Sequence, residues 1–186
     1  MGLDVVYYTN IEFIREAYPD SKKEESKRKE EGWDEDAWIK NIPVFPSFFD
    51  IEELSDCELF RKRADGLNEG IYKADKRGEF RVGSYGYHHK FRVAICSKIM
   101  GYRWKRDEDG FDLPLFLKEK QPFEAFINMS DCEGYIGPYT SVRLFNDFVK
   151  YQSKAREKLT EEEYETYMDW LNAFKAVKNN GVIILC

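Results

Sequence analysis

Two stretches of the chain share one pattern, and this pattern constrains the fold more than any other feature of the sequence. In each, a strand-like run breaks at two glycines and continues into a sequence with helical periodicity. The first spans 79–101 and breaks at Gly83 and Gly86, and the second spans 123–149 and breaks at Gly134 and Gly137. A strand that passes through a glycine loop into a helix presents backbone N–H groups to a ligand. The pattern therefore predicts an α+β domain with a polar pocket.

Length and composition favour a single domain over residues 1–186. A chain of 186 residues is long enough to bury one sizeable core. Aromatic residues make up 16% of it, which indicates a core built on Phe, Tyr and Trp. Lys and Glu crowd the stretch 20–36. We interpret this stretch as a solvated helix or an insertion, with a partner-docking arm as the alternative.

Charge, hydropathy and cysteine spacing disfavour several classes of protein. The formal net charge of −6 argues against a long nucleic-acid partner, which needs a basic face. No apolar run approaches the roughly 20 residues that cross a bilayer, so we expect no membrane partner. The four cysteines lie far apart without a C-x-x-C pair, so neither a zinc ribbon nor a thioredoxin-type site is expected. These features predict a cytoplasmic protein with free thiols, no metal and no cofactor.

Apolar periodicity predicts one small mixed β-sheet with helices packed on it. Runs of β-branched and aromatic residues favour strands in four segments. These are Leu3–Tyr8, Glu79–Val82, Phe123–Asn128 and Val182–Leu185. The last is apolar throughout and is therefore expected near the centre of the sheet.

Helical spacing predicts a short helix over 11–18, one after Gly86 and a long one from Ser141. Thr140 or Ser141 is expected to cap the long helix. Thr160 and Glu163 match a capping box, in which each side chain accepts from the other's backbone N–H. A further helix is expected behind this box.

The first glycine unit gathers cationic, hydroxyl and aromatic side chains. Guanidinium groups clamp phosphate, aromatic rings stack on a base, and amides at a helix start take the remaining oxygens. This combination favours an anionic, ring-bearing ligand such as a nucleotide, although a hydrated tyrosine-rich turn would have the same composition. The predicted ligand contacts are Arg81, Ser84, Tyr85, Tyr87, His88, His89 and Arg92. The sequence lacks the Gly-Lys-Ser/Thr of a Walker loop, which disfavours ATP hydrolysis of that type.

His88 and His89 are a poor metal pair. Adjacent residues on a helix point about 100° apart and lack the i, i+4 spacing that brings two imidazoles together. Hydrogen bonding or exposure is the expected role of each.

The second glycine unit offers two carboxylates, Asp131 and Glu133. They could read ribose hydroxyls, act as a general acid/base pair, or cap local backbone amides. Cys132 lies between them, and two flanking carboxylates would disfavour its thiolate. The predicted ligand contacts in this unit are Ser130, Asp131, Glu133, Gly134, Gly137 and Thr140.

Three segments of the chain resemble a family of small hypothetical proteins from bacteriophages and their hosts. They are Met1–Asp4, Phe80–Tyr87 with Arg92 behind it, and Asn128–Pro138 with its Ser-Asp-Cys-Glu-Gly-Tyr-Ile-Gly-Pro motif. The chain departs from the family's pattern in a Gly-Ser-Tyr-Gly-Tyr run that is one residue shorter. It also has His88, His89 and Phe91 where the family has Asn and Trp before the arginine.

By analogy with phage anti-defence proteins, the resemblance implies a sponge that sequesters a nucleotide immune signal. Cyclic oligonucleotides and ADP-ribose derivatives are the classes expected, and a homodimer is a possible assembly. The sequence leaves two alternatives open. One is a phosphodiesterase or nucleotide hydrolase that uses Asp131, Glu133 and a histidine. The other is an inhibitor that binds a host protein through the Phe45–Phe49 region or the Ser21–Asp36 arm.

Overall fold

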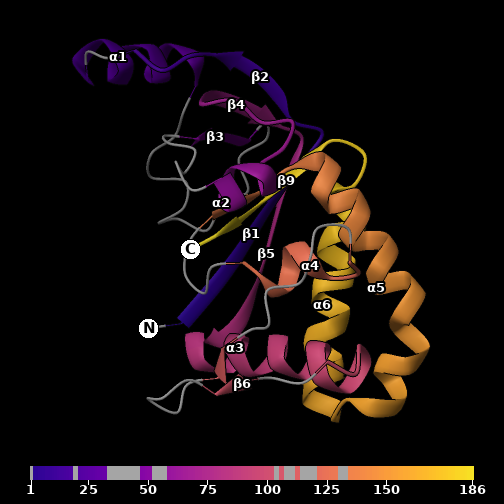
Figure 1. The fold of residues 1–186 in the computed structure, drawn as a ribbon. Coiled ribbons are helices and arrows are strands. Elements are labelled where there is room, and N and C mark those ends of the chain that lie inside the picture. The colour runs from indigo at the N-terminus through magenta and orange to yellow at the C-terminus, as the bar shows by residue number, and fades with distance from the viewer. Residues whose placement is uncertain are drawn as a thin grey trace.

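A four-stranded antiparallel sheet forms the centre of the protein (Figure 1). The computed structural model describes residues 2–18, 21–32, 47–51, 58–102, 105–106, 112–113, 121–129 and 134–186. The strand order is β5-β1-β9-β8, with bounds Lys76–Ser84, Gly2–Thr9, Gly181–Leu185 and Gly134–Ile136. Three of the four predicted strands are thus confirmed or extended, and the apolar C-terminal strand lies inside the sheet as expected.

The sheet is antiparallel throughout, whereas the sequence predicted a mixed one. The helices α5, Pro138–Lys158, and α6, Glu161–Val177, form a hairpin between β8 and β9. A single crossover helix carries the chain to the opposite end of a sheet and gives parallel neighbours. Two helices in series return it to the end where β8 stops, so β9 runs in the reverse direction.

A second sheet lies at one end of the first. It contains β2, β4 and β3 in the order β2-β4-β3, with bounds Glu12–Arg15, Gly70–Ala74 and Ser47–Ile51. A two-stranded ribbon pairs β6, Lys105–Arg106, with β7, Asp112–Leu113. The smaller aromatic cluster stacks Tyr8 on Phe49 at 4.2 Å and Phe49 on Tyr72 at 5.3 Å between ring centroids. The two sheets and the helices confirm an α+β single-domain fold.

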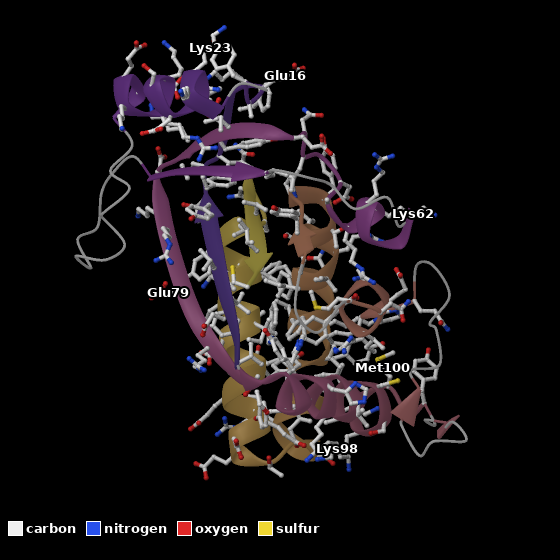
Figure 2. The ribbon with its side chains drawn as sticks, turned by 90° about the vertical axis from the view of Figure 1, so that its left-hand side faces the viewer. Glu16, Lys23, Lys62, Glu79, Lys98 and Met100 are labelled. Atoms are coloured by element: carbon white, nitrogen blue, oxygen red, sulfur yellow. The ribbon has the colours of Figure 1, made fainter. Side chains whose placement is uncertain are left out.

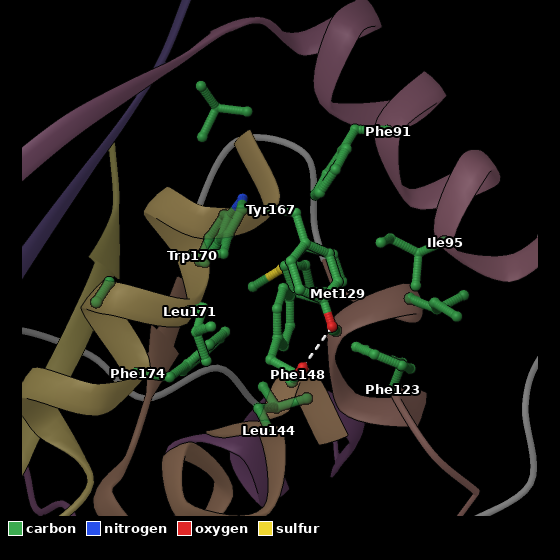
Figure 3. Packing of buried hydrophobic residues seen from close by; sticks show 14 of the residues in the cluster. Phe91, Ile95, Phe123, Met129, Leu144, Phe148, Tyr167, Trp170, Leu171 and Phe174 are labelled. Atoms are coloured by element: carbon green, nitrogen blue, oxygen red, sulfur yellow. Dashed lines mark hydrogen bonds between the residues drawn. The ribbon is translucent and has the colours of Figure 1, made fainter. Parts of the chain in front are cut away.

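The helices α5 and α6 cover one face of the central sheet, and α3 crosses the end of that sheet (Figure 1). The α3 helix spans Tyr85–Ala94 and continues as a π-helical turn over Ile95–Ile99. Between the helices and the sheet lies the main core, in which aromatic side chains from α3, α5 and α6 interlock (Figure 3). Trp170 packs edge-on against Phe126 at 5.0 Å, and the Tyr167 hydroxyl donates to the Phe148 carbonyl at 2.5 Å. This core is aromatic, as the composition indicated.

Two predicted elements are wrong. Residues 123–128 contain the short helix α4, Glu124–Ile127, instead of a strand. Phe123 enters it with a left-handed φ of 59°, and its N–H donates to Asp147 Oδ2 at 2.8 Å. All residues from 123 to 129 are buried, so this apolar run reflects burial on every side and carries no strand alternation. Residues 12–15 form β2 instead of a helix, because they pair with β4.

The charged stretch forms the helix α1, Ser21–Glu31, and residues 33–36 lie outside the described part of the chain. It lies beyond the second sheet, and its side chains are mostly exposed (Figure 1). Arg15 on β2 binds Glu24 at 2.7 Å and Glu31 at 2.9 Å, which fixes one face of α1. The Arg15 guanidinium lowers the pKa of Glu24 to about 2. The helix is confirmed, and these contacts anchor it.

Two helix caps were predicted, one correctly. The capping box at Thr160 and Glu163 is present and begins α6. The α5 helix begins at Pro138, three residues before Ser141, with Gly137 at its N-cap. Proline suits this position because the first turn needs no N–H and its φ is already helical. Thr140 and Ser141 therefore lie within the first turn and cap nothing.

Candidate ligand-binding site

The first glycine turn ends β5 and begins α3. Ser84 caps the helix, since its Oγ accepts from the Tyr87 N–H at 3.1 Å. Gly83 has a φ of 115°, a conformation that only glycine adopts without strain. The positive φ of Gly83 and the Ser84 cap are local features that mark the passage from β5 into α3.

The side chains predicted around this turn point in different directions. Arg81 is exposed and lies 3.7 Å from Asp4 Oδ1. Tyr85 is half-buried against the main core. The Tyr87 hydroxyl pairs with Thr166 Oγ1 on α6 at 3.1 Å, and burial raises the pKa of this phenol. Arg81 is thus exposed, whereas Tyr85 and Tyr87 both pack against the main core.

His88, one of the predicted ligand contacts, lies in the hydrophobic core. Its side chain is fully buried and stacks on Trp170 at 5.7 Å, with the edge of Phe126 at 6.0 Å. Burial, followed by the nearby charges of Arg92 and His89, lowers the pKa of His88 to about 3. A neutral imidazole enclosed by aromatic rings reaches no solvent site. His89, the next residue, is half-buried.

Arg92 connects the first glycine unit to the second. It lies one helical turn beyond His88 and is 5% exposed. Its Nη1 donates to the Ile127 carbonyl at 2.9 Å and to the Met129 carbonyl. Ile127 is the last residue of α4, and Met129 lies two residues beyond it, directly before the segment 130–133. Arg92 thus fixes the chain at the entrance to that segment.

Arg63 makes the same kind of contact from a different element. It ends α2, Glu58–Arg63, and is also 5% exposed. Its Nη2 donates to the Asn128 carbonyl, between the two carbonyls that Arg92 binds. Three consecutive carbonyl groups therefore accept hydrogen bonds from two buried guanidinium groups. Asn128 itself is buried and its amide donates to Glu124 Oε1 at 3.4 Å.

The second glycine turn is built against α2. Gly134 pairs with Leu185 in the sheet and has a φ of 135°. The Gly137 N–H donates to the Arg63 carbonyl at 2.7 Å, and a Cβ at this position would meet the Asp65 carbonyl oxygen at 2.1 Å. Glycine at 137 is therefore needed for close approach between two backbones.

The first turn of α5 places two buried hydroxyl groups beside this contact. The Thr140 N–H donates to Asp65 Oδ1 at 2.9 Å, and its Oγ1 accepts from Arg143 at 3.0 Å. The Ser141 N–H donates to the Gly137 carbonyl at 2.9 Å. Ser141 is fully buried, and its Oγ has no hydrogen-bond partner among the described residues. Ser130, Asp131 and Glu133 lie outside the described residues.

The two glycine turns lie on opposite edges of the central sheet, because β5 and β8 are its outer strands. Three strand spacings separate them, which is about 14 Å. The described residues of the two turns therefore do not line one common recess. What joins the units is Arg92, which reaches from α3 to the carbonyls at 127 and 129.

Sequence reasoning missed Arg63. It is one of three basic residues at the end of α2, and nothing in Arg61-Lys62-Arg63 distinguishes the buried one. Its position becomes informative only once α2 is seen against Gly137. No local signal in the sequence could have identified it.

The described residues hold no group of three or more His, Cys, Asp or Glu side chains that could bind a metal. A hollow of about 430 Å³ lies at the α5–α6 turn, and residues of neither glycine turn line it. It is lined by Arg156, Leu159, Thr160, Glu161, Tyr164 and Glu165. Within the described part of the chain, no helix is long and apolar enough to cross a bilayer.

Comparison of the chain with protein-family models, with curated proteins and with solved structures gave no match.

Proposed function

We propose that this protein binds a small nucleotide-derived signalling molecule and sequesters it without converting it. The proposed site is the segment 130–133, which directly follows Ile127, Asn128 and Met129. We call the carbonyl groups of these three residues the entrance to the segment. One observation carries the proposal. Two buried guanidinium groups, Arg63 and Arg92, come from separate helices and meet at this entrance.

This arrangement suits an anionic ligand. Guanidinium groups present five N–H donors in a fixed fork, and two such groups place fixed positive charge beside the segment. Phosphate oxygens accept from several donors at once, which favours their binding at such a place. The Ser141 hydroxyl, which is buried one helical turn beyond the Gly137–Arg63 contact, has no hydrogen-bond partner among the described residues.

Sequestration is favoured over hydrolysis because one of the two histidines that hydrolysis could use, His88, is in the core. His88 is neutral, fully buried and stacked on Trp170. A general acid or base needs a pKa near the working pH and access to the reacting atoms, and His88 has neither. The hydrolase alternative would depend on Asp131 and Glu133 with His89. The nucleotide class and the phage setting come from the resemblance of the three motif segments.

A ligand screen by thermal shift tests the proposal. The purified chain is heated with cyclic dinucleotides, cyclic trinucleotides and ADP-ribose derivatives, with AMP as a reference compound. A ligand at one hundred times its Kd should stabilise the folded state by about 2.7 kcal/mol. Mass spectrometry of the compound released on heating should recover it intact.

Two conservative variants locate the site. Asp131→Asn and Glu133→Gln should weaken the ligand-induced shift, because carboxylates read hydroxyl and N–H donors that amides match poorly. Glu157→Gln, at an exposed position on α5, is the matched control and should leave the shift unchanged. Absence of a shift with every compound would refute the proposal, and recovery of a converted product would favour the hydrolase.

One observation favours the protein-binding alternative. Tyr139, Val142 and Val149 lie on one side of α5 and are 68%, 39% and 47% exposed. If the protein acts through this surface, Val142→Glu with Val149→Glu should abolish inhibition of a host defence system in cells. The same double variant should leave nucleotide binding unchanged, which separates the two functions.

A further inference from the structure

The strand β5 is a long edge strand of the central sheet. This strand has nine residues and pairs with β1 along one side only. No other described strand pairs with it, and in Figure 2 it forms the left margin of the sheet, beside the label of Glu79. Unpaired N–H and C=O groups along such an edge are a template for another strand.

The two faces of β5 have different chemistry. Phe80 and Val82 point toward the helices, where Phe80 packs edge-on against Trp170 at 5.3 Å. Arg77, Glu79 and Arg81 alternate with them on the opposite face, and their side chains are 43%, 60% and 66% exposed. Along the exposed face, the charge is therefore positive at Arg77, negative at Glu79 and positive at Arg81.

We propose that two copies of this chain associate by antiparallel pairing of their β5 strands, with the two-fold axis at Phe80. Phe80 is the middle residue of Lys76–Ser84, so this register gives the longest overlap of the whole strand, which includes a bulge between Arg81 and Gly83. It sets Glu79 opposite Arg81 of the second copy, and Arg81 opposite its Glu79. Opposite charges on directly facing residues stabilise an antiparallel pair.

Neighbouring registers are less favourable. A two-fold axis at Glu79 would set Glu79 against itself and Arg77 against Arg81, so that all facing charges repel. An axis at Gly78 would restore opposite charges but would shorten the overlap, because the turn at Asp75 ends the strand. Charge pattern and strand length thus favour the same register.

Charge reversal at the paired positions tests the dimer. The molar mass of the full chain is measured by light scattering after size exclusion over a range of protein concentrations, and the wild type should be a dimer. Glu79→Arg sets arginine against Arg81, and Arg81→Glu sets glutamate against Glu79. Each should weaken the dimer at least about tenfold, because attraction becomes repulsion at two symmetric sites. The double variant exchanges the charges and should restore the dimer.

Glu157→Arg and Lys154→Glu are the matched controls. They make the same charge changes at exposed positions of α5, and they should leave the dimer unchanged. All the altered side chains are exposed, so circular dichroism should show that every variant is folded. A monomeric wild type, or a dimer that both single reversals leave intact, would overturn the inference. Dimerisation does not depend on the proposed ligand, so ligand binding and assembly can fail separately.

Discussion

The first glycine turn, Gly83–Gly86, is largely exposed, whereas the second, Gly134–Gly137, rests on the end of α2. At the first, the helix start is satisfied by its own neighbour, Ser84. At the second, the helix start is satisfied from a distant part of the chain, by Asp65 and the Arg63 carbonyl. The cap of the first helix thus lies within the turn itself. The second exists only while α2 is in place.

This difference shows which of the two turns depends on other elements of the fold. A turn that is capped by its own residues tolerates substitutions in neighbouring elements. Its side chains can contact different parts of the molecule. A turn held by another element depends on close packing, so small changes there act on several elements. The buried contacts of Arg63 and Arg92 lie on this dependent side of the molecule.

The largest effect on stability is expected from removing the hydrogen bonds by which Arg92 connects the two glycine units. Arg92→Met keeps most of the side-chain volume but removes the donor to the Ile127 and Met129 carbonyls. Loss of two charge-assisted hydrogen bonds in the core should lower the free energy of unfolding by about 3 kcal/mol. Lys90→Met, on the exposed side of the same helix, should change it by less than about 0.5 kcal/mol. Urea denaturation measures both, and equal effects would show that Arg92 is no link.

The same substitution should have opposite signs at the two turns. Gly137→Ala forces a Cβ onto the Asp65 carbonyl oxygen, and overpacking of this kind costs about 1–3 kcal/mol. At Gly86, in the first turn of α3, the nearest atom to a new Cβ is Ser84 Oγ at 3.9 Å. Gly86→Ala should therefore stabilise the protein by about 0.4–1 kcal/mol, because alanine restricts the unfolded chain. If Gly137→Ala and Gly86→Ala shift the denaturation midpoint in the same direction, the two turns do not differ in this way.

Acid should destabilise the protein through His88. Its pKa is about 3 in the folded state, below the ordinary value near 6.5, so the unfolded chain binds the proton more tightly between these values. Stability is then complete above about pH 6.5 and falls as the pH drops toward 3, by up to about 1.4 kcal/mol per pH unit. In unfolding experiments from pH 7 to 5, His88→Phe should flatten this slope. His89→Gln, one residue away and half-buried, should retain it.

The smallest contrast concerns two serines. Ser84→Ala removes the cap of α3 and should cost about 1 kcal/mol. Ser141→Ala removes a buried hydroxyl that has no partner among the described residues, so it should be neutral or stabilising by up to about 1 kcal/mol. Thermal melts of the two variants should shift in opposite directions. A large loss with Ser141→Ala would reveal a hydrogen bond that the folded protein needs.

Much of the fold could be predicted where the signal was local. The strands at 3–8, 79–82 and 182–185 followed from their composition, and the capping box at Thr160 followed from two residues three apart. The segment 123–128 could not be separated from a strand, because burial on all sides removes the alternation that distinguishes the two. The antiparallel order of the sheet depended on α5 and α6 being two helices in series.

The candidate site was less predictable. Arg92 was expected to contact a ligand and is buried at the entrance to the segment 130–133, whereas His88, one turn earlier on the same helix, lies in the aromatic core. Their sequence neighbourhood is the same. The difference arises from what packs against each side chain, Trp170 for one and the end of α4 for the other.

The sequence by itself determined the local elements: where helices start, where the chain must turn with positive φ, and which segments extend. These depend on groups within about four residues of each other, and the chain specifies them wherever it folds. Only the tertiary structure decided that the glycine turns lie on opposite edges of a sheet, that Arg63 and Arg92 bind consecutive carbonyl groups, and that no described strand pairs with the outer edge of β5. Those outcomes depend on contacts between residues 30 or more positions apart, whose free energies exist only once the core has assembled.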